Sequence, residues 1–142
     1  MTQFPEPFPG LVISYSYLWR KDYLARQEEG AKDRPCAVVL SRNTKGDDTV
    51  VTVAPITHRE PEIPDMAVEI PAKVKEYLNL DSEASWIICT EVNRFVWPGP
   101  DIRPITGQGN KTYGYGVLPP GLFSKVTKTI VRSLAKIVSR SA

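Results

Sequence analysis

The chain has 142 residues, 42% of them apolar and 24% charged, with a net charge of +2 at pH 7. This length suits one domain around one core, and this composition excludes a disordered chain and a membrane protein. The longest apolar runs are far shorter than the roughly 20 residues that span a bilayer, and the N-terminus does not have the pattern of an export signal. We therefore expect one globular, cytoplasmic domain over residues 1–142.

Charge and cysteines are unevenly distributed. Five of the 18 basic residues and none of the 16 acidic residues lie from Gly121 onward, which leaves residues 1–120 at −3. A nucleic-acid site must therefore be a local basic patch. Cys36 and Cys89 each lie in a β-branched apolar run, so we expect two reduced core thiols. Because His58 is the one histidine and no Cys-x-x-Cys pair exists, we predict no metal site and no cofactor.

The first half of the chain alternates between predicted strands and polar loops. Residues 1–9, rich in Phe and Pro, predict an extended lead-in, and the alternation from Leu11 to Leu18 predicts a half-buried strand. Residues 19–33 are highly charged and predict an exposed loop with room for a helical turn. The runs 36–40 and 49–54 are β-formers joined by a turn rich in Asn, Gly and Asp, which predicts an antiparallel hairpin.

The second half continues with short elements. The pattern predicts, in chain order, a polar loop at 57–65, a strand at 67–70, a helix from Pro71 to Leu78, strands at 85–90 and 92–96, a Pro- and Gly-rich loop at 97–110, and a strand at 113–118. The last segment has apolar residues at every third or fourth position and basic residues between them. It predicts an amphipathic helix over about residues 120–139.

These elements indicate a mainly β fold with short helices. Six or seven short strands separated by turn residues fit a small, strongly bent antiparallel sheet better than any βαβ pattern. We expect this sheet to close into a β-barrel with the C-terminal helix packed across it, because closure removes exposed strand edges.

The first candidate for chemistry is the charged loop at 29–35, which runs directly into the predicted strand at 36–40. The following proline and a rigid strand would hold Arg34 with little side-chain freedom, so that its planar guanidinium can bind a phosphate. The alternative is a surface ion pair with Asp33 or Glu29.

A second candidate lies where the strand at 49–54 ends, at Thr57, His58 and Arg59. Polar side chains at the end of a buried strand have a rigid support. Thr57 can donate a hydrogen bond to a phosphate oxygen, His58 can exchange a proton, and Arg59 can bind a phosphate. The alternative is a capped turn with an exposed histidine.

The third candidate, residues 91–97, mixes polar groups with aromatic residues on alternate positions. Aromatic faces stack on unpaired bases, and Asn and Arg bind base edges or phosphates. Asn93, Arg94 and Trp97 are therefore predicted nucleic-acid contacts. The alternative is that the aromatic residues belong to the core.

Together these segments resemble the MazF/PemK toxin family. The matching pieces are Gly10 at the start of the first strand, the loop at 29–34, the run Arg34-Pro35-Cys36-Ala37-Val38-Val39-Leu40-Ser41, the strand end Val53 to Thr57, the stretch 89–92 and the closing helix. The resemblance covers nearly the whole chain. Its Arg-Pro-x-x-Val-Val-Leu-Ser run and its Pro-x-Thr strand end are moderately specific each, and more so in this order and spacing.

The resemblance implies an SH3-like barrel, a homodimer and sequence-selective, metal-independent cleavage of single-stranded RNA. It also implies a small antitoxin that neutralises the toxin by lying over the RNA groove. Among the residues, Glu29 matches the family's loop acid, Arg34 its phosphate-facing arginine and Thr57 its strand-end hydroxyl.

Cleavage of RNA without a metal uses the neighbouring 2′-hydroxyl as nucleophile, and so needs a base, an acid and a stabiliser of the charged phosphorane. We expect Glu29, or failing it His58, to act as the base, while Arg34 stabilises the phosphorane. Thr57 would position a phosphate oxygen. Further RNA contacts are expected from Lys32, Arg59, Asn93, Arg94 and Trp97.

Two other functions fit the same residues. The barrel could be a binding module without catalysis, which grips a protein as gyrase-poisoning toxins of this architecture do, or which binds RNA without cutting it. It could also be an inactive family member with a regulatory role. Truncation of the C-terminal helix and substitution of Arg34 would separate the protein-binding class from the nuclease class.

Overall fold

The computed structural model describes residues 4–27, 30, 32–105 and 112–140. The strands are β1 Leu11–Tyr15, β2 Arg34–Asn43, β3 Thr49–Thr57, β4 Ala67–Glu69, β5 Trp86–Ile88, β6 Glu91–Val96, β7 Gly114–Val117 and β8 Lys136–Ser139. The helices are α1 Arg20–Leu24, the 3-10 helix η1 Pro64–Met66, α2 Ala72–Tyr77 and α3 Pro120–Ser133. No helix in this part of the chain has the length and hydropathy needed to cross a membrane.

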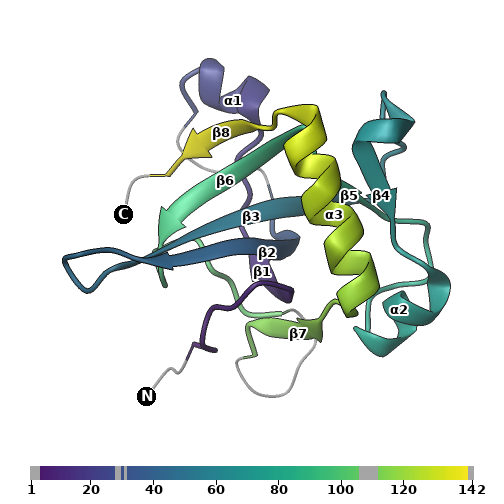
Figure 1. Ribbon diagram of the computed structural model, residues 1–142, viewed down its shortest axis with the longest axis horizontal. Coiled ribbons are helices and arrows are strands. Elements are labelled where there is room, and N and C mark those ends of the chain that lie inside the picture. The colour runs from purple at the N-terminus through teal and green to yellow at the C-terminus, as the bar shows by residue number, and fades with distance from the viewer. Residues whose placement is uncertain (1–3, 28–29, 31, 106–111, 141–142) are drawn as a thin grey trace.

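The strands form one bent sheet in the order β4-β5-β3-β2-β1-β7, with β6 paired to β3 and β8 paired to β6 (Figure 1). All pairs are antiparallel except β6 with β8, which run parallel. The mainly β class and the C-terminal helix are confirmed. The sheet is not closed, however, because β4, β7 and β8 each pair with a single strand within the described residues.

Strand β3 is the centre of this sheet. It pairs with β2 along one edge, while its other edge pairs first with β6, at Val50–Val53, and then with β5, at Ile56 and Thr57. The predicted hairpin of β2 and β3 is confirmed, and its register sets Cys36 opposite Pro55. Because both edges of β3 are paired, Thr57 lies at the end of a firmly held strand.

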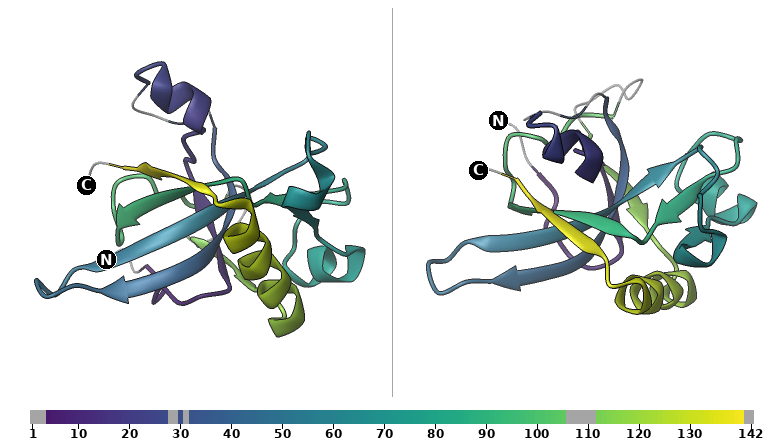
Figure 2. Two further views of the ribbon diagram at one scale, coloured as in Figure 1. Left: turned by 45° about the horizontal axis from the view of Figure 1, so that its top comes forward. Right: turned by 90° about the horizontal axis from the view of Figure 1, so that it is seen from above.

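Apolar side chains are buried on both faces of the sheet. Val12, Ala37 and Ala54 belong to a cluster that includes Val126 of α3, which lies across this face (Figures 1 and 2). Leu11 and Ile13 point the other way, into a second cluster. A strand that is buried on both faces reads as a nearly continuous apolar run, as β1 does. The predicted reduced core thiols are also confirmed, because both cysteines are free and buried.

The first strand is shorter than predicted. It ends at Tyr15, although the chain stays buried through Leu18. Beyond Tyr15 the backbone leaves the strand ladder: the Ser16 N–H donates to the Asp101 carbonyl oxygen at 2.8 Å, and Leu18 binds the side chain of Asn93. Burial pattern alone could not show this change of partner.

The C-terminal helix prediction was too long. Helix α3 ends at Ser133, because Leu134 adopts a left-handed conformation with φ of 54° that breaks the helix. Residues 136–139 form β8 instead. The expected apolar stripe is therefore interrupted at its end: Leu134 is 79% exposed and Ile137 is 48% exposed.

Candidate functional site

A concave pocket of about 950 Å³ lies where β2 begins and β3 ends. Its walls include five of the residues predicted from sequence: Lys32, Arg34, Thr57, His58 and Arg59. The other wall is formed by residues from the loop after α2 and from the segment between β5 and β6. The pocket therefore brings together the first two candidate segments, which are more than 20 residues apart in the sequence, and Glu91 of the third.

Arg34 is the first residue of β2, between β1 and β3. It pairs with Tyr15 of β1, and the β2–β3 register begins with Cys36 opposite Pro55, so that continuing it by two residues on each strand would set Arg34 opposite Thr57. Side chains directly opposite each other in an antiparallel pair lie on the same face. The guanidinium and the Thr57 hydroxyl group are thus presented to the same pocket from neighbouring strands.

The guanidinium of Arg34 is half-buried and lies over the ring of Trp19, with 5.1 Å between Cζ and the ring centroid. Its Nε is buried and has no hydrogen-bond partner, and the group makes no ion pair, among the residues that the structure describes. Burial lowers the pKa of Arg34 from its usual value. The alternative partner expected from sequence, Asp33, faces Arg103 instead, at 3.8 Å.

A partly desolvated cation without a counter-ion is energetically costly, and an anionic ligand would remove that cost. The planar fork of an arginine fits phosphate oxygens well. This feature distinguishes Arg34 from a surface arginine, and it makes the pocket suited to a phosphate group.

Thr57 is half-buried at the end of β3. Its Oγ1 accepts a hydrogen bond from the Arg59 N–H at 3.1 Å, which caps the turn that follows the strand. The hydroxyl proton is still available for a ligand, because this contact uses only a lone pair of the oxygen. The capped turn and the phosphate-positioning role, which appeared as alternatives in the sequence, are therefore compatible.

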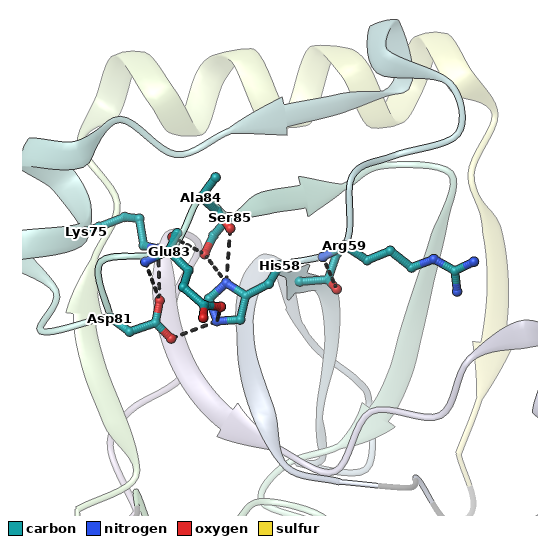
Figure 3. Close-up of polar contacts among 8 residues, drawn as sticks. His58, Arg59, Lys75, Asp81, Glu83, Ala84 and Ser85 are labelled. Atoms are coloured by element: carbon teal, nitrogen blue, oxygen red, sulfur yellow. Dashed lines mark hydrogen bonds and ion pairs between the residues drawn. The ribbon is translucent and has the colours of Figure 1, made fainter.

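His58 is held on both sides of its ring (Figure 3). Nε2 lies 2.7 Å from Asp81 Oδ2, while Nδ1 lies 3.0 Å from the Ala84 carbonyl oxygen and 3.0 Å from Ser85 Oγ. A general base needs one ring nitrogen directed at the substrate. Since both nitrogens face protein groups, the arrangement does not favour His58 as the base, and the ring instead ties the end of β3 to the loop at 81–85.

Glu91 is a pocket residue that the sequence interpretation did not assign. It begins β6, and it is the one carboxylate on the described pocket wall that is not classed as exposed. Its Oε1 accepts hydrogen bonds from the Tyr17 hydroxyl at 3.1 Å and from the Arg20 N–H at 2.9 Å. Burial raises the pKa of Glu91. An acid two residues after the apolar run 86–89 was the available sequence signal.

Apart from Glu91, the third candidate segment, residues 91–97, does not line the pocket. Asn93 was predicted to bind RNA, but it is fully buried, and its amide group donates to and accepts from the Leu18 backbone at 2.9 Å in each case. Its burial and these bonds occupy the amide group, so the arrangement does not favour Asn93 as an RNA contact. Arg94 and Trp97 do not line the pocket, and Trp97 packs against Phe95 with 6.0 Å between ring centroids. Glu29, the predicted loop acid, lies outside the described residues.

One group of described residues could hold a metal ion: His58, Asp81 and Glu83, whose ligand atoms lie within 4.8 Å of one another. All three are exposed, and Lys75 Nζ already lies 3.1 Å from Asp81 Oδ1 (Figure 3). The ammonium group satisfies that carboxylate and opposes a second cation beside it. We assign no chemical step to this group.

Fold and pocket together define a small β-sheet protein with a phosphate-suited pocket at the ends of two central strands. Residues 18–95 match the family described as PemK-like, MazF-like toxin of type II toxin-antitoxin system. The chain belongs to this family, and the matched range contains Arg34, Thr57 and Glu91. It does not contain α3 or β8. A comparison with curated proteins found no match. Type II systems pair a toxin with a protein antitoxin, so the family membership implies such a partner.

Proposed function

We propose that this toxin is an endoribonuclease that cuts single-stranded RNA without a metal ion. The observation that carries the proposal is the Arg34 guanidinium, which is half-buried, lacks an acidic partner among the described residues, and shares a pocket with a hydroxyl group and a half-buried carboxylate. These three groups are what phosphoryl chemistry through a charged intermediate requires.

In the proposed reaction the 2′-hydroxyl of one nucleotide attacks the adjacent phosphorus atom. Its proton passes to a carboxylate, and the bond from phosphorus to the 5′ oxygen breaks. The 5′ oxygen takes up a proton, which leaves a 2′,3′-cyclic phosphate on one fragment and a 5′-hydroxyl on the other.

We assign to Arg34 the stabilisation of the negative charge that develops on the phosphorane. Thr57 is assigned the positioning of one phosphate oxygen. Burial lowers the pKa of Arg34, which makes it a better proton donor than an exposed arginine, but its pKa still favours an electrostatic role. We assign the base to Glu91, because it is the half-buried carboxylate on the described pocket wall and because burial raises its pKa. Glu29 stays a second prediction for this role.

The charges on the pocket wall are mixed. Lys32 and Arg59 are exposed cations near Arg34 and Thr57 in sequence, whereas Glu60, Glu62 and Asp81 are exposed acids on the same wall. An RNA strand would therefore make few phosphate contacts here, and we place them on Lys32, Arg34 and Arg59.

The decisive experiment is incubation of the pure protein with a long single-stranded RNA in EDTA, followed by sequencing of the cut ends and chemical analysis of their phosphates. We expect cuts at a short sequence, with cyclic phosphate and 5′-hydroxyl ends. Arg34→Ala should lower the cleavage rate by on the order of 10²-fold or more, as for other lost transition-state contacts.

Arg42→Ala is the matched control, because Arg42 lies on the same strand but is exposed and does not line the pocket. It should cut RNA at the wild-type rate. Full activity in a folded Arg34→Ala protein, or cleavage that EDTA abolishes, would contradict the proposal. Loss of toxicity on truncation of α3, with Arg34→Ala still toxic, would instead indicate a protein-binding toxin.

The proposal includes a cognate antitoxin that covers this pocket and a homodimer as the active form. RNA cleavage would place the protein in the cytoplasm with its substrate. Sedimentation at several concentrations tests the dimer. Protection of Arg34 from a guanidine-modifying reagent when the antitoxin is added tests where the antitoxin binds.

A further inference from the structure

We propose that Trp19 is a positioning residue, whose indole ring holds the Arg34 guanidinium in the pocket and is itself held by β6. This inference rests on the proposed function for its effect on cleavage. Its structural part concerns only the contacts of Trp19 and can be tested without RNA.

The Trp19 ring contacts two neighbouring side chains. Trp19 lies on the pocket wall, half-buried, and its face receives the Arg34 guanidinium at 5.1 Å. The edge of the ring packs on Tyr17, with 5.1 Å between centroids and 70° between planes. A cation over an indole face is attracted by the ring quadrupole, and more strongly when it is desolvated. With no acid beside it in the described structure, Trp19 is the main orienting contact of the Arg34 side chain.

The backbone on both sides of Trp19 is fixed to β6. Before it, Leu18 exchanges two hydrogen bonds of 2.9 Å with the side-chain amide of Asn93, which replaces a strand partner. After it, the Arg20 N–H donates to Glu91 at 2.9 Å. Asn93 and Glu91 are two residues apart on β6. Their side chains therefore hold the backbone on both sides of Trp19, as two successive hydrogen bonds between paired strands would.

The Asn93 amide is itself secured. Arg140 Nη1 donates to Asn93 Oδ1 at 3.0 Å, and Arg140 Nη2 lies 3.1 Å from Asp101 Oδ2. A fully bonded, buried polar cluster is rigid because each unmade bond would leave a desolvated group. The Trp19 ring is therefore carried by a rigid support, as expected for a side chain that must fix the direction of another.

The experiment compares Trp19→Leu with Trp19→Phe. If Trp19 positions the group that stabilises the transition state, Trp19→Leu should lower kcat about tenfold with little change in KM, and Trp19→Phe should recover most of kcat. Trp86→Leu is the matched control: it also removes a half-buried indole, but one that does not line the pocket, and should leave kcat and KM of the folded protein unchanged.

A second readout needs no RNA. In the wild-type NMR spectrum the Arg34 Nε–H, assigned by its absence in Arg34→Lys, should show an upfield ring-current shift, and Trp19→Phe should reduce that shift. An Arg34 Nε–H at an ordinary shift would overturn the proposal. A raised KM with normal kcat in Trp19→Leu would also overturn it, because that result marks a base-stacking surface. If wild-type protein cuts no RNA but the shifted resonance is present, the nuclease function fails and the positioning contact stands.

Discussion

Two arginines in this protein lie over aromatic rings, and their surroundings differ. Arg140 lies 5.6 Å from the Tyr15 ring centroid and bonds to the Asp101 carboxylate, the Asn93 amide and the Ser16 carbonyl oxygen. Arg34 lies 5.1 Å from the Trp19 centroid, with an unbonded Nε and no ion pair within the described residues. Burial of a charged side chain therefore does not by itself identify a functional site. A functional site is indicated where a buried charged group lacks the hydrogen-bond and ion-pair partners that would offset the cost of its burial.

The largest expected effect is on stability, and it should differ between substitutions of these two arginines. Arg140→Met should lower the free energy of unfolding by about 3 kcal/mol, because the buried Asp101 carboxylate loses its closer partner and keeps only Arg103, whose Nη2 lies 4.0 Å from Oδ1. Arg34→Met removes a desolvated cation that has no counter-ion, so it should leave stability unchanged or slightly higher. Urea unfolding of both variants measures the difference. Equal losses would break the distinction between a structural and a functional arginine.

Glu91→Gln should lower RNA cleavage by on the order of 10²-fold, the usual contribution of a general base. A base must be ionised, so wild-type cleavage should fall as the pH drops through the raised pKa of Glu91, at a higher pH than for an ordinary glutamate, whose pKa is about 4.3. A pH–rate profile of both proteins checks this. If Glu29→Gln removes the fall in cleavage rate at low pH and Glu91→Gln keeps it, the general base is Glu29 and not Glu91.

The same shift gives a stability control for Glu91. Since its folded pKa lies above its unfolded pKa, its contribution to stability is complete below the unfolded pKa and is lost as the pH rises through the folded pKa. Glu91→Gln should therefore show a smaller loss of stability over that pH range than the wild type. A variant that changed cleavage without this signature would point to a long-range rearrangement.

Gly30→Ala should lower stability by about 1–3 kcal/mol, as overpacking does. A Cβ at this position would lie 2.3 Å from the Tyr17 carbonyl oxygen and 2.9 Å from Ser16 Oγ, so the loop before Arg34 must move away. Gly46→Ala is the control, since a Cβ there meets nothing within 4 Å, and it should unfold like the wild type. Thermal unfolding and RNA cleavage of both variants would show whether the loop must pack closely for activity.

The smallest expected effects concern the exposed cations. Lys32→Ala and Arg59→Ala should each weaken RNA binding modestly and reduce the slope of log affinity against log salt by about 0.7, the value for one phosphate contact on a single strand. Arg94→Ala should leave that slope unchanged, because Arg94 does not line the pocket. Binding of a non-cleavable RNA at several salt concentrations measures all three. A reduced slope in Arg94→Ala would extend the RNA surface beyond the pocket.

Sequence reasoning located the features that depend on neighbouring residues. The hairpin of β2 and β3, the strand entry at Arg34 and the strand end at Thr57 follow from local patterns, and the structure places both side chains in one pocket. The proximity of Arg34 and Thr57 was predicted only through the family resemblance, because no local sequence pattern shows that the start of one strand lies beside the end of another.

The features that the sequence did not predict depend mainly on residues that are far apart in the chain. Asn93 had the composition of a binding residue, but its partners are Leu18, 75 positions away, and Arg140, 47 positions away. Glu91 was passed over because Tyr17, 74 positions away, supplies the contact that helps to hold it in the pocket. The end of α3 was missed because the apolar spacing continues past Leu134, where the backbone turns left-handed.

The double pairing of β3 also has a kinetic consequence. Val51 to Ile56 are buried, and the strand has neighbours along both edges, so its amide hydrogens should exchange with solvent only through the largest opening motions of the protein. The short, largely exposed helix α1 should open much more readily. Thr57 would then stay fixed during the frequent small fluctuations that open α1, so that the end of β3 and this helix exchange their amide hydrogens at different rates.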